Sequence, residues 1–236
     1  MRYILKITFF IIMMLYSSIS YALDVVSHVP ENPSKAILMM HGLGGNARSV
    51  SWLTKKLEKD FPDMAFFYPT APDKASNGGF QWFEIPTLGE ALSEEKIYDI
   101  IMQTALLNVG KLHDLIEHIH QKTQIEYDNI YIAGFSQGGF MAILTAITNN
   151  KRIGKVVSFS GVPILLTKDF KQSDVKSKPE ILVIQGDKDY VIPNNSYRLT
   201  QDTLNILNMA PNTKVIKNLG HSINDEAIKS AIEFLK

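Results

Sequence analysis

The sequence has no cysteine among its 236 residues. That absence excludes disulfide bonds, thiolate metal sites, a lipid-anchored cysteine and a cysteine nucleophile. The chain also lacks an excess of either charge, because Lys and Arg together number 24 and Asp and Glu together number 24. A chain without net charge offers no global electrostatic attraction for nucleic acid or for an anionic membrane. We therefore expect no nucleic-acid partner, and we expect any nucleophile to be serine, threonine, lysine or aspartate.

The first 22 residues have the pattern of an export signal. Two basic residues flank the start of an uncharged apolar run, "ITFFIIMMLY", and the small residues Ser20 and Ala22 follow at the positions that a signal peptidase requires. We predict a signal peptide at 1–22, cleavage before Leu23, and a periplasmic or secreted protein with no stable membrane insertion after cleavage. The alternative is an uncleaved anchor, since 7–23 is close to the shortest length that spans a bilayer.

Beyond the signal, short β-rich runs alternate with helical patterns. The runs are mostly apolar, which is typical of strands buried on both faces, and they lie at 35–40, 64–68, 130–134, 155–160, 181–186 and 213–217. The longest helical pattern, at about 97–121, has apolar residues three and four positions apart. Alternation of strand and helix predicts an α/β fold with a doubly wound, mostly parallel sheet. Because no linker interrupts the pattern, we expect one domain at 23–236.

One serine stands at a junction between a predicted strand and a predicted helix. The segment "GFSQGG" places Ser136 between Gly134 and Gly138. In this G-x-S-x-G pattern the glycines leave room for a sharp turn that exposes the serine hydroxyl. The helix that follows, at about 137–148, directs its first N–H groups toward a developing anion. The pattern also occurs by chance in glycine-bearing turns, but this context predicts that Ser136 is a nucleophile.

A serine nucleophile requires a base and a group that orients the base. His221 follows the last predicted strand, and histidine accepts and returns a proton near neutral pH. Asp187 and Asp189 both follow the strand at 181–186, in the chain order Ser, Asp, His. We favour Asp189 as the orienting acid, because Asp187 lies closer to the strand end, where aspartate commonly caps its own turn.

Acyl transfer further requires two backbone N–H donors for the oxyanion. Gln137 follows the nucleophile, and Leu43 lies in the glycine-rich loop "HGLGGNA", so their amides are the candidates. His41 at the start of that loop is better interpreted as a structural residue than as a second base. The loop also spells G-x-G-x-x-A, a dinucleotide fingerprint, but the strand at 64–68 is not followed by the acidic residue that such a site requires.

These segments together resemble the phospholipase/carboxylesterase family of α/β-hydrolases, which includes the acyl-protein thioesterases. The resemblance covers nearly the whole mature chain through "HGLGG", "YPTAP", "QWF", "GFSQGG", "GDKDYVIP" and "GHSI". It implies an α/β-hydrolase domain with Ser136, Asp189 and His221 as the triad, and no metal or other cofactor. The chain departs from the family at Gly45 and Glu84 and at Gln185, where a histidine is frequent. We expect none of these departures to affect the chemistry.

Loop lengths and apolar residues limit the size and the chemical class of the expected substrate. Too few residues lie between Ser160 and Ile181 for a helical lid domain, so we expect an open site. Candidate substrate-binding residues that would line an apolar acyl channel are Trp82, Phe83, Leu165 and Val191. The "VPILL" segment that contains Leu165 has an equally good interpretation as core. We expect a small or medium carboxylic ester, or a lysolipid, as substrate.

Other interpretations are weaker. His113, Glu117 and His120 fall on one side of a helix, but neither an H-E-x-x-H motif nor a further ligand accompanies them. Alternative functions are an acyl-protein or acyl thioesterase, an acyl-binding pseudoenzyme and a secreted peptidase. The intact set of Ser136, Asp189 and His221 argues against a pseudoenzyme, and the lack of a propeller or specificity domain argues against a peptidase.

Overall fold

The computed structural model describes residues 23–236 apart from residues 77, 87–91 and 194. The predicted signal peptide lies outside the described residues. Among the helices of the described segments, none is long and apolar enough to cross a membrane.

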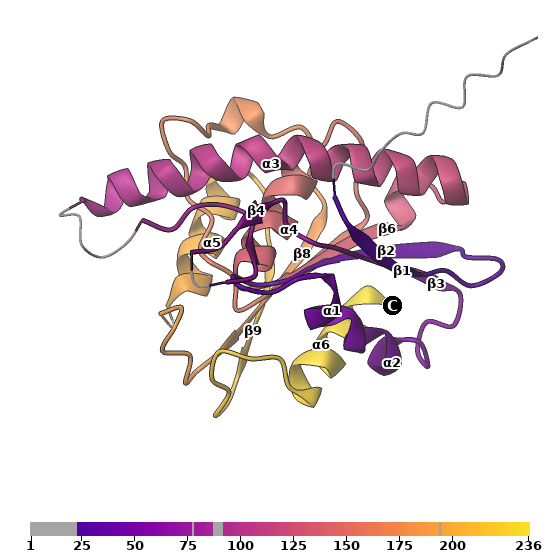
Figure 1. The fold of residues 1–236 in the computed structure, drawn as a ribbon. Coiled ribbons are helices and arrows are strands. Elements are labelled where there is room, and N and C mark those ends of the chain that lie inside the picture. The colour runs from indigo at the N-terminus through magenta and orange to yellow at the C-terminus, as the bar shows by residue number, and fades with distance from the viewer. Residues whose placement is uncertain (1–22, 77, 87–91, 194) are drawn as a thin grey trace, which may run out of the picture.

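A seven-stranded sheet forms the centre of the fold (Figure 1), with the strand order β1-β3-β2-β6-β7-β8-β9. The strands are β1 (Val25–His28), β2 (Lys35–Met40), β3 (Met64–Pro69), β6 (Ile130–Phe135), β7 (Lys155–Phe159), β8 (Glu180–Gly186) and β9 (Asn212–Ile216). Strand β1 is antiparallel to β3, and the other neighbours in this sheet are parallel. The six predicted strands correspond to β2, β3, β6, β7, β8 and β9, which confirms the predicted α/β fold.

Helices cover both faces of this sheet. They are α1 (Ala47–Val50), α2 (Thr54–Leu57), α3 (Glu94–Thr123), α4 (Gln137–Thr148), α5 (Ser196–Ile206) and α6 (Asp225–Leu235). Three short 3-10 turns, η1 (Ser51–Leu53), η2 (Tyr127–Asn129) and η3 (Gln172–Asp174), and a small hairpin of β4 (Asp73–Lys74) and β5 (Phe80–Gln81) complete the described elements. Figure 1 shows α3, α4 and α5 on one face, and α1, α2 and α6 on the other.

Each strand contributes to two cores because successive side chains point to opposite faces. In β2, Leu38 and Met40 pack with the buried side of α3 and α4, whereas Ile37 and Met39 pack with α1, α2 and α6. Burial on both faces explains why the parallel strands appear in the sequence as apolar runs. The loops that carry the predicted site residues follow β2, β6, β8 and β9, so they meet at the carboxyl edge of the sheet.

Candidate active site

The serine occupies the tip of a tight turn between β6 and α4. Ser136 is the N-cap of α4, and its backbone has φ 56° and ψ −118°. Such a conformation costs a non-glycine residue on the order of 1–3 kcal/mol, and residues of this kind cluster at functional sites. The turn is held by the N–H of Ser136, which donates to the carbonyl oxygen of Phe159 over 2.9 Å. The sharp turn expected at Ser136 is therefore present.

Two glycines make this turn possible. A Cβ atom at Gly134 would lie 2.0 Å from the carbonyl oxygen of Gly138. A Cβ atom at Gly138 would lie 2.3 Å from the carbonyl oxygen of Met40, in the neighbouring strand β2. Both contacts are to backbone atoms, which cannot move aside as a flexible side chain can. The spacing G-x-S-x-G is thus set by the close approach of α4 to β6 and β2.

Asp189 and His221 form a buried pair after β8 and β9. Nδ1 of His221 lies 2.8 Å from Oδ2 of Asp189, and the carboxylate side chain is 0% exposed while the histidine side chain is 16% exposed. The contact uses Nδ1 of His221, so Nε2 is the ring nitrogen left to accept a proton. This is the geometry by which an aspartate fixes the tautomer of a catalytic histidine.

The structure brings Asp189, and not Asp187, to the histidine. Asp189 also caps its own turn, because Oδ1 accepts the backbone N–H groups of Val191 at 3.0 Å and of Ile192 at 2.9 Å. The turn-capping role was expected of Asp187, whose Oδ1 is instead buried without a hydrogen-bond partner in the described part of the chain. The reason is geometric: a carboxylate two residues further along reaches both its own turn and the neighbouring loop.

Hydrogen bonding keeps the Asp189 carboxylate ionised. Burial by itself raises its pKa, but the bond from His221, the N–H groups of Ile192 and Val191 and the charge of His221 act in the opposite direction. The pKa of Asp189 is lowered overall. The group thus remains an anion that can stabilise a protonated His221.

The three loops converge on the serine. The ring of His221 packs on Phe135, the residue before Ser136, with ring centroids 4.7 Å apart. A Cβ atom at Gly42 would lie 3.2 Å from Cβ of Ser136, so the loop after β2 passes directly beside the nucleophile. Ser136 itself is 8% exposed. The histidine ring therefore lies against the residue before the serine, and the predicted oxyanion loop lies beside the serine itself.

His41 fixes the orientation of the loop that carries Leu43. The backbone N–H of Ala71 donates to Nε2 of His41 over 3.0 Å, so the ring proton is on Nδ1, which lies 2.7 Å from the carbonyl oxygen of Gly42. Burial lowers the pKa of His41, although the bond to Gly42 opposes this, and the ring is neutral. Because a peptide unit is planar and trans, holding the Gly42 carbonyl directs the N–H of Leu43 to the opposite side. His41 thus has the structural role predicted from the sequence.

The side chain of Gln137 has a function that the sequence did not reveal. Its Oε1 accepts the N–H of Trp82 and its Nε2 donates to the carbonyl oxygen of Phe83, each over 3.0 Å. The indole N–H of Trp82 in turn donates to the carbonyl oxygen of His41 over 2.9 Å. This network joins the start of α4 to the Leu43 loop, so the two predicted oxyanion amides are held relative to one another.

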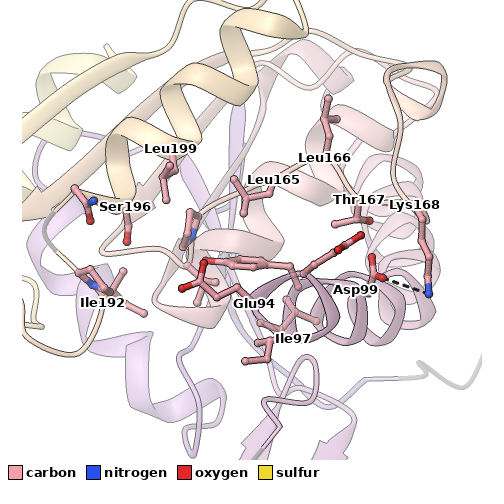
Figure 2. Close-up of a pocket in the computed structure, with 17 residues that line it drawn as sticks. Glu94, Ile97, Asp99, Leu165, Leu166, Thr167, Lys168, Ile192, Ser196 and Leu199 are labelled. Atoms are coloured by element: carbon pink, nitrogen blue, oxygen red, sulfur yellow. Dashed lines mark ion pairs between the residues drawn. The ribbon is translucent and has the colours of Figure 1, made fainter. Parts of the chain in front are cut away.

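A cleft of about 810 Å³ with both apolar and charged walls lies next to the loop that carries Asp189 (Figure 2). Its walls come from the start of α3, the segment after β7 and the start of α5, with Ile97, Val162, Leu165, Leu166, Ile192 and Leu199 as apolar lining. Ser136, Asp189 and His221 do not line it; the connection is Ile192, whose side chain lines the cleft and whose N–H binds Asp189. The size is that of a typical small-molecule site.

The predicted substrate-binding residues separate into two groups. Leu165 lines the cleft, as Figure 2 shows, whereas Val191 does not line it and is 66% exposed. Trp82 and Phe83 instead belong to the core and are 0% and 1% exposed. Their burial follows from the Gln137 network and from the packing of Phe83 on Phe140, with ring centroids 5.0 Å apart. The structure thus places these two residues beneath the oxyanion loop and not along the cleft.

The three residues on one side of α3 have separate partners. His113 bonds the carbonyl oxygen of Thr145, His120 bonds that of Ile125, and Glu117 bonds Gln121 and Tyr127. Across the described residues, no cluster of three or more His, Asp and Glu side chains is placed to hold a metal ion.

The sheet, the strained serine and the buried Asp189–His221 pair define a hydrolase of the α/β class. Residues 22–236 match the family model of phospholipases and carboxylesterases, and the chain belongs to this family.

Relatives support the same family. The chain is 29% identical over 215 residues to acyl-protein thioesterase 1 of Eremothecium gossypii, covering 86% of this chain and 88% of the relative. It is 28% identical over 212 residues to a probable carboxylesterase SOBER1-like of Arabidopsis thaliana, covering 85% and 77%. The fold is similar to that of esterase PE8, with a TM-score of 0.80, 24% identity and coverage of 90% and 97%.

We predict that Asp189→Asn lowers the rate of ester hydrolysis by roughly ten-thousandfold, because an amide holds the imidazole in the wrong tautomer. Asp187→Asn is the matched control and should leave the rate little changed, since the carboxylate that binds His221 is that of Asp189, and Oδ1 of Asp187 has no hydrogen-bond partner among the described residues. Steady-state kinetics of both variants, with circular dichroism to verify folding, would measure this. A large loss of rate in Asp187→Asn with a small loss of rate in Asp189→Asn would assign the role of orienting acid to Asp187.

Proposed function

We propose that the protein is a serine hydrolase that cleaves carboxylic esters through an acyl-enzyme. Ser136 is the nucleophile, His221 is the general base and acid, and Asp189 orients the histidine. The backbone N–H groups of Leu43 and Gln137 bind the oxyanion. The observation that carries the proposal is the buried Asp189–His221 pair, which packs against the strained turn that presents Ser136.

The chemistry follows from this arrangement. Oγ of Ser136 attacks the carbonyl carbon while Nε2 of His221 takes the hydroxyl proton. The negative charge moves to the carbonyl oxygen, which the two backbone amides stabilise. Collapse of this intermediate breaks the bond to the leaving group, which takes the proton from His221. A water molecule then repeats the sequence on the acyl-enzyme, releasing the carboxylic acid and restoring Ser136.

Replacing the nucleophile tests the proposal. Ser136→Ala should lower hydrolysis of p-nitrophenyl butyrate by up to about a millionfold, as loss of a triad nucleophile can. The variant should remain folded, because the substitution removes only one hydroxyl. A fluorophosphonate probe should label the wild type at Ser136 alone, as mass spectrometry of peptides would show.

Two outcomes would contradict this assignment. Retained esterase activity in Ser136→Ala would exclude Ser136 as nucleophile, and labelling at Ser160 or Ser222 would relocate it. A folded wild type that binds esters without Ser136-dependent turnover would be an acyl-binding pseudoenzyme.

The cleft suggests where the acyl group binds. Its apolar wall starts at Ile192, beside the Asp189 turn, and Figure 2 shows the Asp99–Lys168 ion pair away from Ile192. The apolar part of this open cleft would accept a small or medium acyl chain, or the chain of a lysolipid, as substrate. Several relatives are named acyl-protein thioesterases, which favours a thioester as the second candidate substrate. Rates on matched oxyesters and thioesters would decide between them.

A chain-length series tests the acyl site. For the wild type, kcat/KM should rise by about fourfold per methylene until the cleft is filled, because each buried methylene contributes about 0.8 kcal/mol. Leu165→Ala should flatten that rise and leave acetate esters nearly unchanged. Trp82→Phe is the contrasting variant, because loss of the indole bond to His41 should lower the rates on all esters by a similar factor. Equal losses on short and long esters in Leu165→Ala would remove Leu165 from the acyl site.

We also propose that the protein is exported. The support is the basic, apolar and small-residue pattern of residues 1–22. Expression of the full chain in a bacterial host should give a periplasmic or secreted protein whose N-terminus is Leu23, by intact mass and N-terminal sequencing. Recovery of the full-length chain in the membrane fraction would instead support the uncleaved anchor.

A further inference from the structure

Gln185, near the end of β8, contacts the carboxylate of Asp189. Nε2 of Gln185 donates to Oδ2 of Asp189 over 2.8 Å, and Gln185 is only 1% exposed. Nδ1 of His221 lies at the same distance from the same oxygen. Two side chains therefore share Oδ2, and one of them lies outside the proposed triad.

The carboxylate is fully hydrogen-bonded as a result. Oδ2 accepts from Gln185 and His221, and Oδ1 accepts from the backbone of Val191 and Ile192. An ionised carboxylate has about four sites for donors. With all of them in use, Asp189 cannot turn without breaking a hydrogen bond, and its charge is divided among four donors.

Stability alone gives a poor account of a glutamine at this position. The other end of its amide, Oε1, is buried and has no hydrogen-bond partner among the residues that the structure describes. A buried acceptor without a partner is destabilising, and an apolar side chain of similar length would avoid that cost. The amide contributes a short bond to Asp189, at 2.8 Å, and a longer one from the same nitrogen to the carbonyl oxygen of Ile192, at 3.5 Å.

We propose that Gln185 is a positioning residue of the hydrolase: it holds Asp189 in line with His221 and limits how strongly Asp189 favours the protonated form of that histidine. This inference rests on the proposed function of the Ser136 site. Gln185 touches no reacting atom and acts only through Asp189.

The direction of its effect on pH dependence follows from the charges. Removing the Gln185 donor leaves more negative charge on Oδ2, which strengthens the attraction for the imidazolium form of His221. As the pH falls, His221 then becomes protonated at a higher pH, and the protonated ring cannot act as base. The acid limb of the pH–activity profile therefore moves to higher pH. The charged side chain that acts on the pKa of Asp189 is His221. The other charged or titratable groups of the loops after β8 and β9 are half-buried Asp187 and exposed Lys188, Tyr190 and Lys217.

The test compares Gln185→Met, which keeps the length of the side chain and removes the donor, with Ile184→Val. Ile184 is the neighbour of Gln185 in β8, is 1% exposed and lies in the core on the α6 side. Gln185→Met should move the acid limb of kcat/KM for p-nitrophenyl butyrate upward by about half a pH unit, a fraction of what a charge-assisted hydrogen bond contributes. Ile184→Val should lower the melting temperature without moving the limb.

Two measurements do not depend on turnover. In the Ser136→Ala background, NMR titration of the His221 ring should show the same upward shift when Gln185 is replaced by Met. In the otherwise unmodified chain, the side-chain amide signals of Gln185 should change with pH at the pKa of His221, because both groups bind Oδ2.

The outcomes separate the two proposals. If the wild type shows no Ser136-dependent hydrolysis, the proposed hydrolase function is rejected. The NMR titrations would still test the link between Gln185 and His221. An unmoved acid limb and an unmoved His221 titration in folded Gln185→Met would overturn the role of Gln185. If Gln185→Met does not fold, the unmodified chain provides the test. Side-chain amide signals of Gln185 that stay constant while His221 is protonated would equally overturn the role of Gln185.

Discussion

The close contact between the start of α4 and the ends of β6 and β2 is the constraint on which the site depends. At Gly134 and Gly138 the backbones approach so closely that no Cβ atom fits. This contact forces the chain through the strained turn at Ser136 and places the first N–H groups of α4 beside the hydroxyl. The loop after β2 lies against the same junction, since the Cβ position of Gly42 is in contact with Ser136. The proposed nucleophile and the proposed oxyanion donors thus depend on the same packing contact.

Much of the fold follows from local sequence patterns. The parallel strands are buried on both faces, so each appears as an apolar run of the right length. Strand β1 was not predicted, because it has only four residues, lies at the edge of the sheet and is at most half-buried. Its pairing with β3 depends on a long-range contact that the residues Val25–His28 do not signal by themselves.

The site was predictable where a residue's position after a strand determines its role. Ser136, Asp189 and His221 each follow a strand at the same edge of the sheet, so topology alone brings them together. The roles of Gln137 and Gln185 were not predictable, because they depend on where a side-chain amide points. Gln185 was expected to be remote from the chemistry, yet its amide contacts Asp189. Trp82 was predicted to line an apolar acyl channel, whereas its N–H groups fix it in the core.

The support of Asp189 has an evolutionary consequence. Two of its four donors are main-chain N–H groups, which are present whatever side chains stand at 191 and 192, provided that neither is proline. Selection can therefore alter those side chains, one of which lines the cleft, without weakening the acid. The third donor is the ring of His221, which the proposed reaction requires. Among the four donors, Gln185 is therefore the side chain whose replacement would change the hydrogen bonding of the carboxylate and leave the proposed triad in place. With the proposed roles of the cleft and of Gln185, substrate range and pH response would depend on different residues.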